Sequence, residues 1–569
     1  MASPDSQTSG KKSVTASLGK DASAGVVLGV ESVPDGLAGG LLAGVNPVFG
    51  LYGYMVGTLA GGLTTSSAFM AVQATGAMAV VVSDVDAVQA GAPDADTALW
   101  TLAVMTGIIM LVLGLFKLGS LVRWVPNSVL AGFINAVAIN IILGQFADFT
   151  GYTDAEGANK VVKAIDTLFN VSAFDWATVA VGTATIVLIV LLERTRLGAL
   201  GMVVAILLTS AAVPLFGLDS VQRLEDVADI PGSLPTPSLP ALSLVATLIV
   251  PALSLTFVGL VQGAAISGSV PNPDGEYPDS SGDFRGQGIA NIASGVFQGM
   301  PVGGSMSATS IVTSAGAKSR LALIIAGLTM MLVILLFSDL VSLIAMPALA
   351  GLLIIVGVKT LKPEQVRMVW RTGTTQALVM IVTFVLTLLI PLQYAVLIGV
   401  FAALVLFVTR QSNQVTVDRM FVTKDGQLSE GERPETLPGG EVVALRPTGS
   451  LFFAAAPVFE AQLPEITDDS AGAVVVIVLR GKEELGSTFI NVMTRYGDRL
   501  RDIGGQLMLS GVSEDVYDQL ERTGVLGEIG AENVYRATNA LTGDALKVMA
   551  VAQGLAGQQP EQPPADGQD

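Results

Sequence analysis

Apolar runs long enough to cross a bilayer alternate with short polar loops over the first 410 residues of the chain. A helix that spans hydrocarbon needs about 20 predominantly apolar residues. Full-length or nearly full-length runs occupy residues 99–116, 125–146, 176–192, 200–216, 242–267, 321–337, 340–358, 375–390 and 392–408. This pattern predicts a transmembrane domain over residues 22–410, preceded by a cytosolic N-terminal segment of residues 1–21.

Several further apolar runs are short or interrupted. The run 22–44 contains Pro34 and Asp35, and the other short runs are 50–62, 70–82, 288–299 and 306–315. Together the runs predict about fourteen helices, an even number that puts both ends of the domain on the same side of the membrane.

Two of the short runs follow a similar pattern. The segments GGLTTSSAFMAVQATGAM (61–78) and VGGSMSATSIVTSAGA (302–317) each contain a glycine pair, a Ser/Thr cluster and a short apolar stretch. They lie an odd number of helices apart, so the two halves would be inverted repeats. Short, glycine-interrupted segments at matching positions indicate a transporter site. The alternative is that small residues only allow close helix packing.

The starts of these two short helices are the predicted substrate site. A helix N-terminus offers free N–H groups and a partial positive charge to an anion, and hydroxyl groups add donors. Gln262 adds a neutral polar group deep in another run. The predicted substrate-binding residues are Gln73, Ala74, Thr75, Gln262, Ser305, Met306, Ser307 and Ala308.

Two carboxylates lie in the first run. Glu31 and Asp35 are four residues apart and flank Pro34. Ionisable groups within spans are costly and usually functional. They suit coupling to a proton or sodium ion; the alternative is that one of them faces water at a helix break or caps it.

Basic residues indicate the orientation, because cytosolic loops are enriched in Lys and Arg. With a cytosolic N-terminus, the inner loops hold Lys117, Arg123, Arg194, Arg196, Lys318, Arg320, Lys359, Lys362, Arg367, Arg371 and Arg410. The outer stretches 83–98 and 216–240 are acidic and nearly free of Lys and Arg, whereas 148–166 is an exception. We expect a multi-pass protein of a bacterial plasma membrane, with both the N-terminus and the C-terminal domain in the cytosol.

The chain beyond residue 410 reads as soluble. Apolar strands such as GAVVVIVLRG alternate with amphipathic helices such as TFINVMTRYGDRLRDIG, which predicts βα units on one sheet. We expect a linker over 411–439, an α/β domain over 440–552 and a disordered tail over 553–569, which is rich in Gln, Pro and acidic residues.

Composition excludes several function classes. The chain has no cysteine and no histidine, which rules out disulfides, Ser–His–Asp triads and Cys/His zinc sites. Its formal net charge of −18 argues against a nucleic-acid partner. We expect no enzyme activity, no metal site and no cofactor beyond a coupling ion, Na⁺ or H⁺.

The segments AGVVLGVESVPDGLAGGLLAGVNPVFGLYGYMVGTLAGGL and FRGQGIANIASGVFQGMPVGGSMSATSIVTSAGAKSRLA resemble the two characteristic stretches of the SulP anion transporters, the family that includes the animal SLC26 proteins. The soluble domain resembles STAS domains. The resemblance implies two inverted repeats of about seven helices each, arranged as core and gate domains. It also implies a homodimer and a small inorganic or carboxylate anion as substrate.

Four positions depart from the pattern that many relatives share. Asp35 stands where a glutamine is common, Gln262 replaces an acidic residue, and Ala308 replaces an arginine. Losing the acid at Gln262 moves the expected coupling role to Glu31 and Asp35. In the STAS domain Ser487 survives from a phosphorylatable motif, but Gly486 replaces the aspartate before it. We expect a docking role there for a cytosolic partner.

The expected function is a secondary active transporter of a small anion of the sulfate, bicarbonate or carboxylate class, coupled to a cation and working by alternating access. Two alternatives remain open at this stage. One is a nucleobase-type transporter of the same architecture, and the other is a non-transporting membrane sensor that signals through its STAS domain.

Overall fold

The computed structural model divides into two compact units, Met1–Ala403 and Leu404–Asp569. It describes residues 5–119, 125–152, 160–228, 230–391, 394–395, 398, 401, 405, 408–409, 412, 414–423, 425, 427–539 and 543–556, with side-chain surroundings from residue 17 onward.

The first unit is helical. Its first half contains α1 (Asp5–Leu42), α2 (Pro47–Thr64), β1 (Ala71–Gln73), α3 (Gly76–Ser83), α4 (Ala95–Leu115), α5 (Asn127–Leu143), α6 (Phe146–Thr150), α7 (Lys160–Phe169), α8 (Trp176–Glu193), α9 (Leu200–Leu215) and α10 (Leu224–Val227). Its second half contains α11 (Val245–Ser267), α12 (Ser280–Val296), β2 (Gly303–Ser305), α13 (Met306–Ser314), α14 (Leu321–Ser342), α15 (Met346–Thr360), α16 (Pro363–Thr372) and α17 (Thr374–Leu389).

Every apolar run predicted up to residue 390 overlaps one of these helices. The run 392–408 lies largely outside the described residues. Within the described part, seven helices are long and apolar enough to cross a membrane, and α9 and α17 are shorter apolar helices. The composition therefore matches a domain that sits in a bilayer.

Several bounds differ from the expectation. The start of the run 70–82 forms β1, and α14 extends to Ser342, so that α15 begins only at Met346. Pro34 lies inside α1, which continues to Leu42, so the expected helix break is absent. A proline is tolerated within a membrane helix because neighbouring helices satisfy the freed carbonyl. Helix α12 begins at Ser280, well before the predicted run 288–299, because Asp279 caps it and its polar first turns are buried in the protein.

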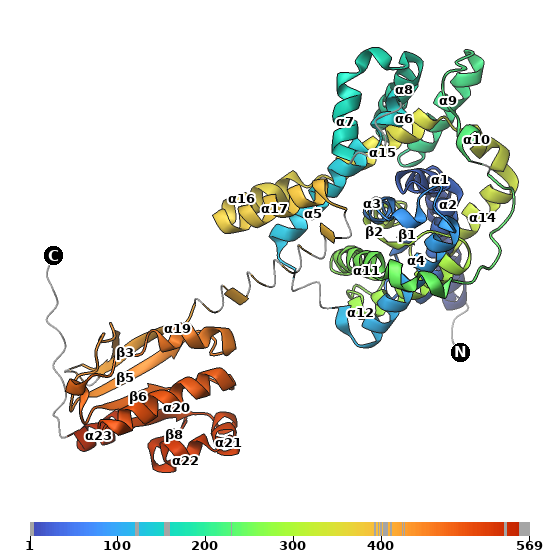
Figure 1. Ribbon diagram of the computed structural model, residues 1–569. Coiled ribbons are helices and arrows are strands. Elements are labelled where there is room, and N and C mark those ends of the chain that lie inside the picture. The colour runs from blue at the N-terminus through green and yellow to red at the C-terminus, as the bar shows by residue number, and fades with distance from the viewer. Residues whose placement is uncertain are drawn as a thin grey trace. The chain divides into compact units, whose positions relative to one another are not determined.

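The two halves are inverted copies that pack on each other reciprocally. Helix α4 of the first half packs on α11 and α12, as α14 of the second half packs on α1 and α2. At the centre, β1 pairs antiparallel with β2, with Ala71 opposite Ser305 and Gln73 opposite Gly303. Figure 1 shows this ribbon among α1, α2, α4 and α11. An antiparallel pair of equivalent strands fits a twofold relation between inverted repeats.

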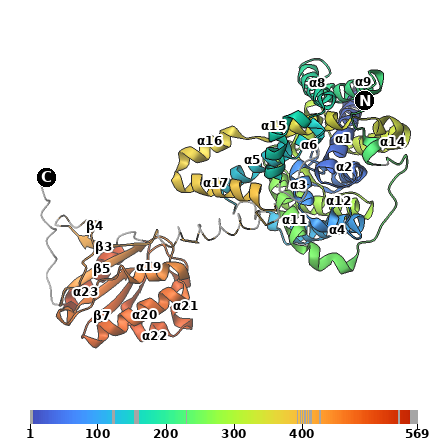
Figure 2. The same ribbon diagram turned by 45° about the horizontal axis from the view of Figure 1, so that its top comes forward.

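The helices form two groups. One group contains α1–α4 and α11–α14, which make extensive contacts with each other. The other contains α5, α8 and α9 together with α15, α16 and α17. Figures 1 and 2 show α5, α16 and α17 side by side within the second group. These groups correspond to the expected core and gate domains.

Glycines allow the backbones of α4 and α12 to approach closely. A Cβ atom at Gly288 would lie 2.7 Å from the backbone nitrogen of Leu111 and 2.8 Å from the carbonyl oxygen of Gly107. Small residues at such crossings permit the van der Waals packing that holds helices together in lipid.

The second unit is an α/β domain. Its sheet has the order β4-β3-β5-β6-β7-β8, and β5 to β8 are parallel. The strands are β3 (Thr416–Val422), β4 (Leu428–Gly431), β5 (Val442–Thr448), β6 (Val474–Val478), β7 (Gln506–Val512) and β8 (Val534–Arg536). The helices are α19 (Ala456–Glu460), α20 (Ser487–Asp502), α21 (Glu514–Arg522), α22 (Val525–Ile529) and α23 (Gly543–Ala556).

The strand β6 is apolar at every position because helices cover both of its faces. Val475 and Ile477 pack with the cluster that includes α19, α20, α21 and α22, whereas Val474 and Val476 pack with α23 on the other face. A strand covered on both faces loses the alternation of apolar and polar residues.

The predicted boundaries of this domain need correction. Strands β3 and β4 fall within residues 411–439, the expected linker, because β3 pairs with β5 and so completes the sheet on that side. Helix α23 extends to Ala556, past the predicted end at 552, because its apolar residues cover the sheet. Residues 557–569 of the predicted tail lie outside the described residues.

We predict that Gly288→Ala destabilises the membrane unit. Alanine normally stabilises a helix by about 0.5–1 kcal/mol relative to glycine, but here the added Cβ would overlap backbone atoms of α4. The measurement is the melting temperature of purified protein in detergent.

Gly19→Ala is the matched control, since Gly19 is also helical and a Cβ there would meet nothing within 4 Å. It should leave the melting temperature unchanged or raise it slightly. Equal melting temperatures for the two variants would contradict the close crossing of α4 and α12.

Candidate substrate site

The ribbon brings the two short helices together. Helix α3 begins just after β1 and α13 begins just after β2, and because the strands are antiparallel, the helices leave from opposite ends of the ribbon. Thr75 caps α3 by accepting a hydrogen bond from the Met78 N–H (3.3 Å). Ser305 caps α13 in the same way, accepting from the Ala308 N–H (3.3 Å). The two helix starts therefore lie at the two ends of a ribbon only three residues long, and their common anion pocket stays a prediction.

Gln73 ties the ribbon to the first repeat. Its side chain is fully buried, and its Nε2 group donates hydrogen bonds to Ser32 Oγ on α1 (2.9 Å) and to Thr58 Oγ1 on α2 (3.2 Å). Within the described residues the Gln73 Oε1 atom has no hydrogen-bond partner. A buried acceptor without a partner is costly, so this amide is a place where a donor from a ligand or water would be stabilised.

Gln262 ties the ribbon to the second repeat. Its Oε1 atom accepts a hydrogen bond from Thr75 Oγ1 (2.9 Å). The same Oε1 atom lies 3.6 Å from the position that a Cβ atom on Gly303 would take. Gln262 therefore lies next to β2. Gln262 therefore bonds to the cap of α3 beside β2, although the sequence alone did not show which residue it contacts.

The remaining predicted residues divide by exposure. Ala74, Ser305 and Ala308 are buried, whereas Ser307 is exposed and Met306 is 41% exposed. The hydroxyl groups of Ser305 and Ser307 lie 3.2 Å apart. The start of α13 thus presents two hydroxyl groups and an open methionine side chain together.

A row of polar residues on α12 holds the ribbon in place. Asp283, Gln287 and Asn291 are spaced four residues apart, so they lie on one face of the helix. Gln287 Oε1 accepts from the Gly304 N–H (2.9 Å). Asn291 accepts from the Val302 N–H (2.9 Å) and donates to the Val302 carbonyl (2.5 Å).

Asp283 fixes the segment that leads into β1. Its carboxylate accepts hydrogen bonds from the Ser67 N–H (2.7 Å), Ser66 Oγ (2.8 Å) and Ser267 Oγ (2.6 Å). The sequence analysis missed this row. Its signal was the spacing of Asp283, Gln287 and Asn291, which matches one helix face.

The two carboxylates of α1 differ in their surroundings. Asp35 Oδ2 accepts a hydrogen bond from the Tyr54 hydroxyl of α2 (2.7 Å). Glu31 is 5% exposed, and no hydrogen bond or ion pair to it is found among the described residues. Their spacing of four places both on one side of α1.

Comparison with known proteins identifies the family to which the chain belongs. The model of the sulfate permease family matches residues 18–383. The chain belongs to the sulfate permease family. A STAS domain model matches residues 434–540.

Three relatives of this chain illustrate the likeness. The putative sulfate transporter YvdB of Bacillus subtilis is 26% identical, and the match covers 92% of this chain and 97% of that protein. The bicarbonate transporter BicA of Synechocystis is 26% identical, with 85% and 87% covered. The solved structure of SLC26A9 is similar in fold, with a TM-score of 0.82 at 18% identity, over 96% of this chain and 93% of that one.

These findings confirm the fold that the sequence predicted. The chain is a helical membrane domain of inverted repeats followed by a STAS domain. Its family consists of anion transporters and not of enzymes. The family resemblance that was based on two sequence stretches is also confirmed.

In the STAS domain, Ser487 is the first residue of α20 and is exposed. Its neighbour Gly486 occupies the N-cap position and supplies no side-chain hydrogen bond. The hydroxyl group is thus accessible, and both its phosphorylation and its use in docking stay predictions.

We predict that Asp283→Ala lowers the melting temperature of the protein strongly. The change leaves the Ser67 N–H without its acceptor, at a cost of about 1–3 kcal/mol. It also removes one of two acceptors from the Ser66 and Ser267 hydroxyl groups, which keep the Asp279 and Gly263 carbonyls. The measurement is thermal unfolding in detergent, together with anion uptake in proteoliposomes.

Asp279→Ala removes an exposed aspartate one turn away that caps α12 and forms an exposed ion pair with Arg285 (3.8 Å). It should cost about 1 kcal/mol, as lost N-caps do. If Asp279→Ala were as harmful as Asp283→Ala, the row on α12 would not be what fixes the ribbon.

Proposed function

We propose that this chain is a secondary active transporter of a small anion of the sulfate, bicarbonate or carboxylate class. The observation that carries the proposal is the ribbon that joins two helix N-termini at the centre of the inverted repeats. Each N-terminus offers a partial positive charge, and the neighbouring hydroxyl groups of Ser305 and Ser307 add a donor, whereas the Thr75 hydroxyl donates to Gln262 and positions the start of α3. Such a site can bind an anion without a basic side chain.

The division into two groups of helices supports our proposal of transport by alternating access. The candidate site lies wholly on the group of α1–α4 and α11–α14. Movement of this group against α5, α8, α9 and α15–α17 would open the site first to one side and then to the other. We propose that the ribbon moves as a rigid part of the core group, because α12 and α1 hold it from both sides.

The family favours an anion over the other substrates considered from the sequence. One relative is named a putative sulfate transporter and another a bicarbonate transporter. No comparable observation favours a nucleobase. A non-transporting sensor predicts no uptake at all, so the transport measurements below separate it from the proposal.

We place the coupling ion, Na⁺ or H⁺, at Asp35 with Glu31 nearby. An inside-negative potential opposes entry of each negative charge by about 2.3 kcal/mol per 100 mV, a factor of about 50 in accumulation. A co-transported cation offsets this cost. Gln262 carries no charge, so the carboxylates of α1 are the candidates that can hold a cation or a proton beside the site.

We further propose a homodimer in a bacterial plasma membrane, with the N-terminus and STAS domain in the cytosol. The basic loops support this orientation, since Lys359, Lys362, Arg367 and Arg371 cluster around one loop. The exposed Ser487 then faces the cytosol, where a protein partner of the STAS domain could reach it.

We predict that Ser305→Leu raises the Michaelis constant for anion uptake at least tenfold or abolishes uptake. Leucine removes both a hydroxyl donor and the cap of α13, and its bulk fills the space at the helix start. The measurement is the concentration dependence of labelled sulfate and bicarbonate uptake in proteoliposomes at equal protein content.

Ser314→Leu is the control, because Ser314 is the exposed last residue of the same helix. It should leave uptake kinetics unchanged. Unaltered kinetics in Ser305→Leu would remove the start of α13 from the substrate site.

We predict that Asp35→Asn uncouples uptake from the sodium or proton gradient while anion exchange continues. Asparagine keeps an acceptor for the Tyr54 hydroxyl but carries no negative charge, so it cannot attract a cation or take up a proton. Glu31→Gln should have a smaller effect. The measurement compares gradient-driven uptake with gradient-free exchange in the same liposomes.

Asp86→Asn changes an exposed aspartate in the loop after α3 and should keep full gradient dependence. Full gradient dependence in Asp35→Asn as well would show that α1 does not hold the coupling ion.

A further inference from the structure

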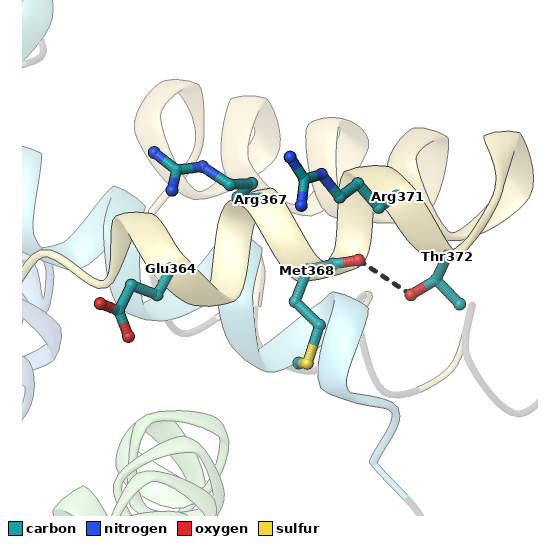
Figure 3. A pocket seen from close by; sticks show the side chains of 5 residues that line it. All are labelled: Glu364, Arg367, Met368, Arg371 and Thr372. Carbon is teal, nitrogen blue, oxygen red and sulfur yellow. Dashed lines mark hydrogen bonds between the residues drawn. The ribbon is translucent and has the colours of Figure 1, made fainter.

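The outer face of α16 carries two arginines that make no ion pair or hydrogen bond among the described residues. Arg367 and Arg371 are exposed and four residues apart, so their guanidinium groups lie on one side of the helix. Figure 3 shows both side chains along the same edge of α16, with Glu364 and Met368 along the opposite edge. A shallow, open hollow of the helix surface lies between these edges, and Thr372 completes its lining.

The opposite face of α16 is occupied by the protein core. Val369 is buried and packs with Val366 against Ala131 of α5 and Met380 of α17. This packing fixes the rotation of the helix, so the side that carries the arginines must point away from the protein. Their exposure is a consequence of the fold and not of a loosely attached helix.

Helix α16 has the composition of a helix at the membrane surface. It connects α15 and α17, two helices of the membrane unit, yet Glu364, Arg367 and Arg371 exclude it from the hydrocarbon. Large apolar side chains are nevertheless exposed, because Met368 is 51% and Trp370 is 61% exposed. Tryptophan is enriched where headgroups meet hydrocarbon, and basic amphipathic helices lie in that plane.

We propose that Arg367 and Arg371 bind the phosphate of an anionic phospholipid. Two guanidinium groups on one helix edge can each donate paired hydrogen bonds to phosphate oxygens. Met368, which lines the same hollow, then contacts the upper part of the acyl chains. The site uses a lipid of the leaflet that faces this helix as a structural ligand.

The net charge of this hollow favours an anionic over a zwitterionic lipid headgroup. Two arginines and Glu364 give the lining a net charge of +1, which an anionic lipid neutralises and a zwitterionic lipid does not. The Glu364 carboxylate can accept hydrogen bonds from headgroup hydroxyl groups, such as those of phosphatidylglycerol. Lys362, exposed at the start of α16, adds to the positive potential.

The experiment measures binding of phosphatidylglycerol to the full-length protein. Detergent-purified protein is titrated with phosphatidylglycerol, phosphatidylethanolamine or phosphatidylcholine, and bound lipid is counted by native mass spectrometry beside the melting temperature. We expect wild-type protein to bind phosphatidylglycerol at least tenfold more tightly than the two zwitterionic lipids.

The variant R367Q/R371Q should lose this preference, whereas R367K/R371K should retain part of it, since lysine keeps the charge without the paired donors. K318Q/R320Q removes two basic side chains from the loop before α14 and should bind phosphatidylglycerol like the wild type. Size-exclusion profiles confirm that each variant is folded before the titration.

Three results would overturn the proposal. The first is wild-type affinity for phosphatidylglycerol in R367Q/R371Q, and the second is equal affinity of the wild type for all three lipids. The third is a rise in melting temperature with inorganic phosphate or glycerol phosphate that matches the effect of the lipid, which would assign the site to a soluble anion.

Discussion

The pairing of β1 with β2 is the interaction on which the membrane unit depends. Two segments of the chain leave the helical conformation in the interior of a domain that sits in a bilayer, and their backbone groups have no access to bulk water. An unpaired backbone group at such depth costs several kcal/mol. The antiparallel ribbon pairs some of these backbone N–H and C=O groups with each other. The side chains of Gln287 and Asn291 form hydrogen bonds with the backbone of Gly304 and Val302.

This constraint explains why polar residues are buried where the sequence otherwise is apolar. Asp283 is buried because three donors from two other segments surround it. Gln73 is buried because α1 and α2 each offer it a hydroxyl group. The same groups that stabilise the unwound segments also determine where the two helix starts lie, so the fold and the candidate site have one physical basis.

The sequence predicted the helices well because their apolar runs are long and the loops between them are polar. It also predicted the two short helices, since each follows glycines and a Ser/Thr cluster. The role of Asp283 could not be predicted, because it fixes the Ser67 backbone from a helix 216 residues further along the chain. The role of Asn291 depends on the turn that brings Val302 back against α12. The strand β3 was missed because its pairing with β5 depends on a neighbour that local sequence does not reveal.

The central ribbon also has a consequence for synthesis of the protein. Gln73 pairs with Gly303, so β1 leaves the ribosome long before its partner strand exists. At about 5–20 residues per second, the delay between the two strands is roughly 10–45 seconds. During this time the first repeat must remain in the membrane with an unpaired strand edge. An assembly factor or the insertion machinery that shields this edge would therefore act on the nascent chain within that interval.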